Sequence, residues 1–584
     1  MKFQEVAQIF ELLEKEPKRL KMTELLAQIL KKATPDDAAT ISYLALGSLR
    51  PVYMSTQFNF AQKSMVKVLA RLLAKSEAEI EDYSHKSGDL GSVIVQLFEQ
   101  KKDIQDLSIK QVNAKLFDFL DLTGTGSQEK KEQELLDILH ALDALSCKYI
   151  VRIILGKLRL GFSDMTLLDA FSWMECGDKS IRQELEDAYN ISVDIGLIIK
   201  VLKEHGIVGI RKITITPGIP IRPAAAERAP DAQSIVKRLG TCLAQPKLDG
   251  FRLQVHIDKS GEKPEIKFFS RNLLDMSSMF PELYTAVLDL EVDTLVAEGE
   301  AIAFDIETKS FLPFQETVKR KRKHDIEQTA QDFPLKLYFF DLLYFNGHSY
   351  LDKTHTERRK ALLKLTETKK VEKHDVIYVV EEQEIETAAQ LDTYFMQTVS
   401  LGLEGLVVKR PDAIYQPGKR NFNWIKLKRQ ETGSLEDTVD CVILGYYFGK
   451  GKRAKFGIGA LLVGIFNKKQ DRFETVAKIG TGLSDQEWID QKKVCDDSAV
   501  PDQPKNVDCA PELYPDVWVA PKTVCMIRAD EITRSPLHRA GATEDNLGFA
   551  LRFPRLMGYR PDKSPFDATT VIELEELFDM QFSK

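Results

Sequence analysis

The sequence lacks the features that mark membrane, secreted and cysteine-stabilised proteins. No apolar run among its 584 residues approaches the roughly 20 needed to cross a bilayer. The N-terminus has no long apolar core followed by a small-residue cleavage site, so it does not resemble a secretion signal. The seven cysteines are scattered, and none forms a CxxC pair. We therefore expect a reduced cytoplasmic chain with no membrane partner, no disulfide framework and no cysteine zinc site.

An overall excess of positive charge is also missing. The formal net charge is −7, whereas most nucleic-acid-binding proteins are basic. The basic residues are nevertheless concentrated locally, with seven of them and one acid, Asp412, between Lys409 and Arg429. Two further basic clusters occupy 319–323 and 450–455. Because phosphate binding depends on where positive charge is placed, the acidic average does not exclude a nucleic-acid partner.

The chain has no internal repeat and no low-complexity tract, and it is too long for one core, so about three to five domains are expected. Apolar residues at helical spacing predict helices up to about Ile210. Four prolines within 214–230 predict an extended linker.

From Cys242 onward the pattern predicts an α+β region, followed after Glu431 by short β-rich segments that suit a small barrel. Alternation of Leu253, Val255 and Ile257 with polar residues predicts a half-buried strand. The other predicted strands are 294–304, 336–345, 405–409, 439–448 and 460–466, and the predicted helices are 357–365 and 385–398.

The residues around Lys247 have the composition of a nucleotide-binding site. Lys247 is followed by Asp249, Gly250 and Arg252, just before a predicted strand. Glycine lets a ligand approach the backbone, arginine offers forked donors for phosphate or ribose oxygens, and nearby positive charge helps a partly desolvated lysine to lose its proton. The motif indicates a lysine nucleophile, although alone the residue would be an ordinary surface charge.

Three further groups, two polar and one aromatic, follow in order, and each has an ordinary structural alternative. Ser270-Arg271-Asn272 would by itself be a polar turn. Glu298 and Glu300 interrupt an apolar run, where a carboxylate is costly unless it is paired or binds a metal. Phe340 could stack on a base, or it could pack in a core beside Phe339.

Two more groups complete the series. Glu404 and Lys409 carry opposite charges at the two ends of a strand-like run. Strand alternation places Lys426 and Lys428 on one face, where they would bind an anion or meet solvent. A lysine nucleophile, sugar donors, acidic residues for a metal, an aromatic ring and paired lysines together make a complete nucleotidyl-transfer site.

This ordered set resembles the ATP-dependent DNA ligases of the archaeal and eukaryotic type, and the resemblance covers nearly the whole chain. It implies an all-α DNA-binding domain at 1–215, an α+β nucleotidyltransferase (adenylation) domain at 216–431 and an OB-fold β-barrel domain at 432–584. Supporting matches are the GKLRLG segment at 156–161, Pro313-Phe314-Gln315 with the basic run to Lys323, and Tyr415 with Gly418-Lys419-Arg420.

The resemblance also implies roles for individual residues. Lys247 is the implied nucleophile, Glu300 holds the ribose, and Phe340 stacks on adenine. The implied ATP-binding residues are Gln245, Arg252, Arg271, Glu300, Phe340, Arg420, Lys426 and Lys428. The implied metal ligands are Glu300 and Glu404, the residues that orient the leaving group are Arg560, Asp562 and Lys563, and the DNA-binding residues are Lys157, Arg159, Arg320 and Arg322.

Two positions depart from the family pattern without removing a reacting group. Many relatives have a glutamate two residues before the nucleophile, where it contacts the adenine amino group, and this chain has Gln245. An amide oxygen still accepts a hydrogen bond from that amino group. Glu298 stands where the family often has aspartate.

The implied reaction uses ATP and Mg²⁺. Lys247 would take AMP from ATP, AMP would move to the 5′-phosphate at a nick, and the 3′-hydroxyl would displace it. The implied partner is nicked double-stranded DNA, wrapped by the three domains as a ring, and a sliding clamp is left open as a further partner. We also expect a monomer, a nucleoid-associated location in a prokaryotic cell and a steep salt dependence of DNA binding.

Three alternatives share parts of this pattern. An RNA ligase or a capping-type guanylyltransferase has the same KxDG core, but the helical N-terminus and the PFQ and basic-run matches favour a DNA ligase. An NAD-dependent ligase is disfavoured by the absence of a cysteine zinc cluster. A catalytically silent DNA clamp or scaffold is disfavoured by the intact reacting set.

Overall fold

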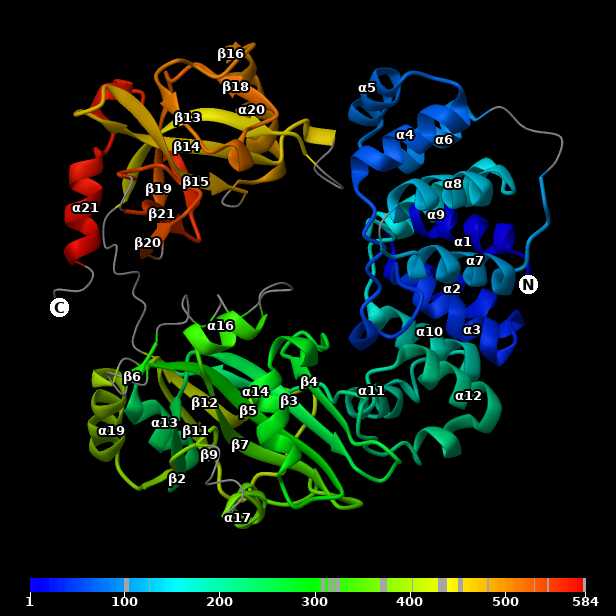
Figure 1. The fold of residues 1–584 in the computed structure, drawn as a ribbon, viewed down its shortest axis with the longest axis vertical. Helices are drawn as coiled ribbons and strands as arrows, with labels where there is room; N and C mark the ends of the chain where they lie inside the picture. Colours follow the sequence, from blue (N-terminus) through cyan, green and yellow to red (C-terminus); the bar gives the residue numbers. More distant parts are fainter. Residues whose placement is uncertain are drawn as a thin grey trace. The chain divides into compact units, whose positions relative to one another are not determined.

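The computed structural model describes residues 1–98, 104–124, 126–305, 310–312, 317, 320, 326–367, 375–401, 403–428, 438–449, 455–480, 483–529, 531–543 and 546–580. It divides into two compact units. The first consists of Met1–Glu77 and Leu97–Arg429, and the second of Ala78–Gln96 and Gln430–Lys584. Figure 1 shows the order of the elements along the chain.

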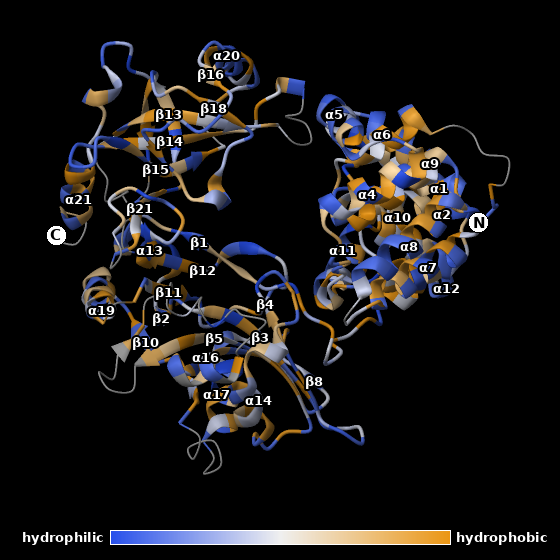
Figure 2. Cartoon of the chain, turned by 45° about the horizontal axis from the view of Figure 1, so that its top comes forward, coloured by the Kyte–Doolittle hydropathy of each residue, from blue (hydrophilic) through white to orange (hydrophobic). Residues whose placement is uncertain are grey.

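Helices form the N-terminal part of the first unit because apolar residues recur every three or four positions. In α1 (Phe3–Lys15) the side chains of Phe3, Val6, Phe10 and Leu13 are buried, and Figure 2 shows hydrophobic residues gathered between the helices. The other helices of this part are α2 (Arg19–Lys32), α3 (Pro35–Ala45), η1 (Val52–Met54), α4 (Gln62–Leu73), α7 (Ile109–Asp121), α8 (Ser127–His140), α9 (Ala144–Ile154), α10 (Asp164–Cys176), α11 (Arg182–Ile191) and α12 (Ile195–Ile210). Among the described residues, no helix has the length and apolar character that a membrane span requires.

The predicted linker after α12 is extended and is tied to the strand β3 (Phe251–Asp258). The Ile221 amide donates to Gln254 Oε1 at 2.7 Å, and the Gly218 amide donates to His256 Nδ1 at 3.0 Å. Gln254 and His256 are therefore buried, like the apolar residues with which they alternate. The prediction of a half-buried strand was wrong on this point, because the linker covers the polar face.

Strands of the first unit form two sheets. The larger sheet has the order β4-β3-β5-β7-β8, with β6 beside β5 and β9 beside β7. Its apolar face packs with α14 (Pro281–Leu288) and α17 (His355–Thr366) in one core. The remaining bounds are β4 (Glu265–Ser270), β5 (Thr294–Asp305), β6 (Ser310–Phe311), β7 (Leu335–Phe345), β8 (His348–Ser349), β9 (Ile377–Val379), η2 (Ser277–Met279) and α16 (Ile326–Asp332).

The smaller sheet has the order β1-β12-β11-β2-β10. Ala244, Leu406 and Ile425 from its three central strands face a core shared with α13 (Ala232–Leu239) and α19 (Ala388–Ser400). The bounds are β1 (Ala225–Arg228), β2 (Cys242–Lys247), β10 (Gln383–Ile385), β11 (Gly405–Lys409) and β12 (Arg420–Lys428). The helix predicted at 385–398 begins later, because Ile385 ends β10 and Thr387 caps α19.

The second unit is rich in strands. Its main sheet has the order β16-β18-β13-β14-β15-β17, with β19 joining β13 to β22, and β20 pairs with β21. The bounds are α5 (Glu77–Ser87), α6 (Leu90–Leu97), β13 (Val439–Tyr447), β14 (Ala460–Asn467), β15 (Arg472–Ile479), α20 (Asp485–Asp496), β16 (Ala499–Val500), β17 (Val507–Asp508), η4 (Pro511–Leu513), β18 (Val517–Val519), β19 (Val524–Arg528), β20 (Glu531–Ser535), β21 (Gly548–Arg552), β22 (Arg555–Tyr559), η5 (Pro565–Asp567) and α21 (Val571–Met580). The predicted order of a helical part, an α+β part and a strand-rich C-terminal part is confirmed.

Candidate active site

Lys247 ends β2 and belongs to a row of residues that crosses the smaller sheet. In the antiparallel register Gly405 of β11 lies opposite Lys247 on one side and opposite Lys428 on the other. Two positions further along, Val407 lies opposite Gln245 and Lys426. Because strand residues two apart point to the same face, Lys426 and Lys428 share a face, as the alternation predicted, and the register places Lys247 on it as well.

Glu404 lies just before β11 and links two of these lysines. Its carboxylate contacts the amines of both Lys247 and Lys428, and the three side chains are 18–25% exposed. The next residue, Gly405, has φ +136°, and a Cβ there would collide with the Leu427 carbonyl oxygen. Glycine therefore allows β11 and β12 to approach closely here. We call Lys247, Lys426, Lys428 and Glu404 the lysine cluster.

The environment of the lysine cluster lowers the pKa of two of its amines. Burial lowers the pKa of Lys247, and Arg271 and Arg252 lower it further, while Glu300 and Asp249 oppose them. For Lys426, burial is again the largest cause of a lowered pKa, and the other contributors are Arg420, Lys247, Arg271 and Arg228. Arg271 and Arg420, both predicted from the sequence, thus add positive charge around the same face.

Glu300 approaches the loop that follows Lys247. The Gly250 amide donates to Glu300 Oε1 at 3.2 Å, and a Cβ at Gly250 would collide with the Ala301 carbonyl oxygen. Burial raises the pKa of Glu300 to about 7, although Lys247, Arg252 and the Gly250 amide act in the opposite direction. This partly buried carboxyl group can therefore accept or donate a proton near neutral pH.

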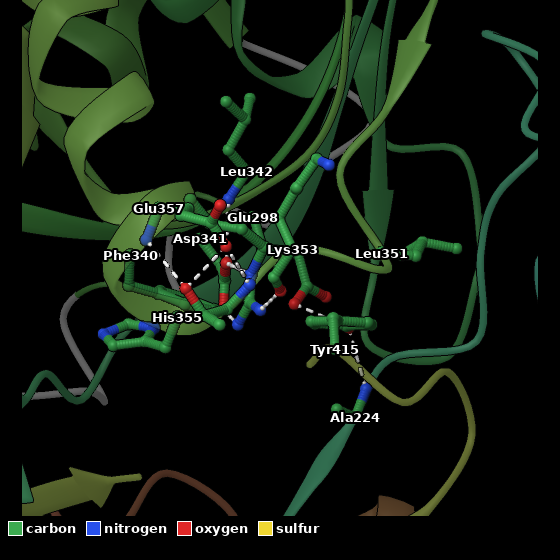
Figure 3. A network of polar contacts seen from close by, with 12 residues as sticks. Ala224, Glu298, Phe340, Asp341, Leu342, Leu351, Lys353, His355, Glu357 and Tyr415 are labelled. Atoms are coloured by element: carbon green, nitrogen blue, oxygen red, sulfur yellow. Dashed lines mark hydrogen bonds and ion pairs between the residues drawn. The ribbon is translucent and has the colours of Figure 1, made fainter. Parts of the chain in front are cut away.

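Arg252 is held by the larger sheet. Its guanidinium donates to both oxygens of Glu298, at 2.9 and 3.0 Å, and to the Ala224 carbonyl at 2.9 Å. The Tyr415 hydroxyl donates to Glu298 at 2.8 Å and accepts from the Ala224 amide at 2.9 Å, as Figure 3 shows. The cost of placing Glu298 in an apolar strand is thus offset by pairing, as its position in the sequence required.

A second buried pair lies on the neighbouring strand β7. Arg358 of α17 donates to both oxygens of Asp341, at 2.6 and 3.1 Å, and their side chains are 1% and 0% exposed. Lys409 donates to the Phe340 carbonyl at 2.9 Å, and burial lowers the pKa of Lys409 to about 8. We call Arg252, Glu298, Tyr415, Asp341 and Arg358 the buried network.

The structure separates the two adjacent phenylalanines of β7. Phe339 is fully buried in the core of the larger sheet. Phe340 is only partly buried and meets Trp424 edge to face, with ring centroids 6.2 Å apart. Core packing therefore explains Phe339, and Phe340 keeps a ring surface on the side of the smaller sheet.

Sequence reasoning missed two residues beside Gln245. The Gln245 amide nitrogen donates to Glu382 Oε2 at 2.7 Å, and His355 Nε2 meets the same oxygen at 2.7 Å. Glu382 and Gln245 are 137 positions apart in the chain, and no local pattern marks either partner. Only folding brings them together.

The residues predicted to bind DNA occupy different environments. Lys157 and Arg159 follow the turn after α9, on either side of the buried Leu158, and are partly exposed. Arg320 is instead buried, with its guanidinium paired to Glu282, so its position does not match the predicted DNA contact. Arg322 and the matching segment Pro313-Phe314-Gln315 lie outside the described residues.

The three residues predicted to orient the leaving group lie together in the second unit. Arg560 pairs with Asp562 at 2.8 Å, and its Nη1 reaches Asp440 at 3.2 Å. Lys563 also donates to Asp440, at 2.7 Å. Asp440 of β13 thus holds both basic side chains at the end of β22.

Family comparisons cover most of the chain. Residues 223–428 match the family described as ATP dependent DNA ligase domain. Residues 2–172 match DNA ligase N terminus, and residues 454–563 match ATP dependent DNA ligase C terminal region. The three matches follow the order of the helical, α+β and strand-rich parts.

Individual proteins agree with these matches over the full length. A "Probable DNA ligase" of Dictyoglomus turgidum is 44% identical over 99% of this chain and 97% of its own. "DNA ligase 1" of Methanosarcina acetivorans is 36% identical over 99% of both. The solved structure Pmar-Lig_PreS3 shares the fold with a TM-score of 0.55 and 18% identity, covering 95% of this chain and 99% of that one. The chain belongs to the ATP-dependent DNA ligases, the enzymes that use ATP to seal nicks in DNA.

Proposed function

We propose that Lys247 is the nucleophile that takes up AMP in the first step of ligation. The observation that carries this proposal is the position of its amine, at the end of β2 beside Glu404 and Lys428, where burial lowers its pKa. The neutral amine attacks the α-phosphorus of ATP. A nitrogen–phosphorus bond forms as the bond from phosphorus to the pyrophosphate oxygen breaks, and the amine proton is released.

Lys426 and Lys428 bind the α-phosphate in this proposal, and Arg271 and Arg420 add positive charge around it. Their gathering is supported by the lowered pKa of Lys426, to which Arg420, Lys247 and Arg271 contribute. Positive groups held in place before the reaction stabilise the charge that develops on a transferred phosphoryl group.

Glu300 holds the ribose, Phe340 stacks on the adenine, and Gln245 contacts the edge of the base. The partly exposed ring of Phe340 supports the stacking role. The guanidinium of Arg252, which was predicted to bind ATP, is held by Glu298 and by the Ala224 carbonyl. We assign it the task of keeping the nucleotide-binding face in shape.

Glu300 and Glu404 are the proposed ligands for Mg²⁺. Carboxylates suit this ion, which usually binds one or two protein carboxylates together with substrate phosphates. Among the described residues no group of three or more His, Cys, Asp or Glu could hold a metal alone, so shared ligation with ATP fits the residues present. When bound, Mg²⁺ would neutralise phosphate charge.

The three proposed domains, 1–215, 216–431 and 432–584, divide the work. Lys157 and Arg159 of the first contact DNA phosphates, and their partly exposed positions support this role. Arg560, Asp562 and Lys563 of the third, proposed as an OB-fold barrel, orient pyrophosphate for departure. We further propose that the protein acts as a monomer in the cytoplasm, at the nucleoid of a prokaryotic cell.

The test uses the full-length protein, radiolabelled ATP and Mg²⁺. Wild type should form a covalent AMP adduct that transfers to a nicked duplex and yields sealed product. Lys247→Ala should form no adduct, while the exposed-lysine control Lys360→Ala behaves like wild type. Adduct formation that survives Lys247→Ala would overturn the assignment of the nucleophile.

A further inference from the structure

The face of the smaller sheet that carries Lys247 changes along β2 from positively charged to aromatic. The first row holds Lys247, Gly405 and Lys428, and the row at the other end sets Lys409 opposite Trp424. Lys409 lies 4.4 Å from the Trp424 ring and donates to the Phe340 backbone, so this end is the aromatic one. A nucleotide with its phosphate at Lys247 would extend its base toward that end.

Gln245 lies between the two ends, two residues from Lys247 on the same face. It is only 2% exposed, so its amide is a buried polar group in the path of the nucleotide. Its nitrogen donates to Glu382 at 2.7 Å. Its oxygen accepts no hydrogen bond from any described residue and remains available to a ligand.

A glutamine amide can present either its oxygen or its nitrogen to a ligand, because the two ends have almost the same shape. With the oxygen toward the ligand it accepts from a 6-amino purine such as adenine. With the nitrogen toward the ligand it donates to a 6-oxo purine such as guanine. A carboxylate can only accept when ionised, so a neighbouring carboxylate forces the amide nitrogen toward itself.

We infer that Glu382 is a positioning residue, which fixes the orientation of the Gln245 amide so that the site selects a 6-amino over a 6-oxo purine nucleotide. The inference rests on the proposed function, because it takes the Lys247 face as the ATP site. It assigns the choice of base to a pair of residues and not to Gln245 alone.

Glu382 is itself held in place by two other side chains. His355 Nε2 lies 2.7 Å from the same carboxylate oxygen, and Arg359 lies 3.8 Å from the other one. Burial raises the pKa of Glu382, but His355, Lys409 and Arg359 outweigh it and leave the pKa below its usual value. The ionised form has no proton to donate, and so the Gln245 nitrogen is kept as the donor.

The test measures adduct formation by the full-length protein with ATP and with GTP, as single-turnover rates over a range of nucleotide concentrations. In Glu382→Gln the carboxylate becomes a second amide, and the Gln245 amide is free to turn over. The ratio of ATP to GTP use should fall by about tenfold, the worth of one misdirected buried hydrogen bond. The maximal rate with ATP should change much less than the ratio. Glu381→Gln removes the same charge at an exposed neighbour and should leave the ratio unchanged.

An exchange variant separates positioning from a merely structural role. Gln245→Glu alone sets two carboxylates against each other and should weaken ATP use. The double variant Gln245→Glu with Glu382→Gln restores one donor and one acceptor, with an acceptor facing the base, and should regain the preference for ATP. If Glu382→Gln lowered the preference for ATP only by damaging the structure, adding Gln245→Glu would not restore that preference.

A measurement on wild type covers the case in which the variants fold poorly. Purine riboside triphosphate lacks the 6-amino group, and we expect it to be used about tenfold less efficiently than ATP. Equal use of the two, or an unchanged ATP-to-GTP ratio in Glu382→Gln with normal adduct formation, would overturn the inference while leaving Lys247 as nucleophile. A failure of the proposed function would look different, because wild type would then form no adduct or Lys247→Ala would still form one.

Discussion

The lysine cluster and the buried network lie in the same unit, but the first has an excess of positive charge and the second has balanced charges. Three amines of the lysine cluster stand against the single carboxylate of Glu404, and the side chains remain partly exposed. In the buried network two guanidiniums balance two carboxylates, and Asp341 with Arg358 is sealed from solvent. Surplus positive charge suits a group that must bind a polyanion. Balanced, buried charge suits a group that ties α17 and the segment before β12 to the larger sheet, because breaking it leaves an unpaired ion.

The largest effect that this comparison predicts is on stability and comes from the buried network. Arg358→Met removes the bidentate partner of Asp341 and leaves this buried carboxylate with Lys409, 3.7 Å away, as its remaining cation. The free energy of unfolding should fall by about 3–5 kcal/mol, measured by urea denaturation with a fluorescence readout. Arg211→Met breaks the exposed pair with Glu184 and is the matched control. A loss no larger than that of the control would show that the network does not hold the fold.

The lysine cluster should respond in catalysis instead. In Lys428→Ala the rate of AMP-adduct formation at saturating ATP should drop by about 10²- to 10³-fold, the usual effect of removing one preorganised charge-stabilising group. The unfolding midpoint should stay close to that of wild type, because the surplus charge is not needed for folding. Lys237→Ala, an exposed lysine on α13, provides the control. A large loss of stability with an unchanged maximal rate would erase the contrast between the two groups.

A smaller effect is expected from a neutral polar contact, the one between His256 and the linker. Burial, helped by Lys267, lowers the pKa of His256 to about 3, and Nδ1 must stay unprotonated to accept from the Gly218 amide. The unfolded chain binds this proton near pH 6.5, so the stabilisation is complete above that pH. It should decline by about 1.4 kcal/mol per pH unit below pH 6.5, a loss of about 2 kcal/mol at pH 5.

The measurement is the unfolding free energy of wild type and His256→Gln between pH 5 and 7.5. The substitution should flatten the slope that wild type shows below pH 6.5. Parallel slopes for the two proteins would mean that another group is responsible for the loss at low pH.

Much of the site could be predicted because it depends on local rules. Strand alternation correctly put Lys426 and Lys428 on one face, and the position of Glu298 in an apolar run correctly required a partner. Helical spacing correctly predicted helices that end at Ile210. These features follow from the period of a strand or a helix and from the cost of an unpaired buried charge.

The sequence by itself determined which residue types reach the site and in what order, because the backbone period and the chemistry of phosphate binding act over a few residues. Only the tertiary structure decided the partners. It buried Arg320 against Glu282, covered the polar face of β3 with the linker, and brought Glu382 beside Gln245 from 137 positions away. A side chain's partner in a buried contact depends on which elements lie side by side. The pairing of strands that are distant in sequence cannot be predicted from any short stretch of sequence.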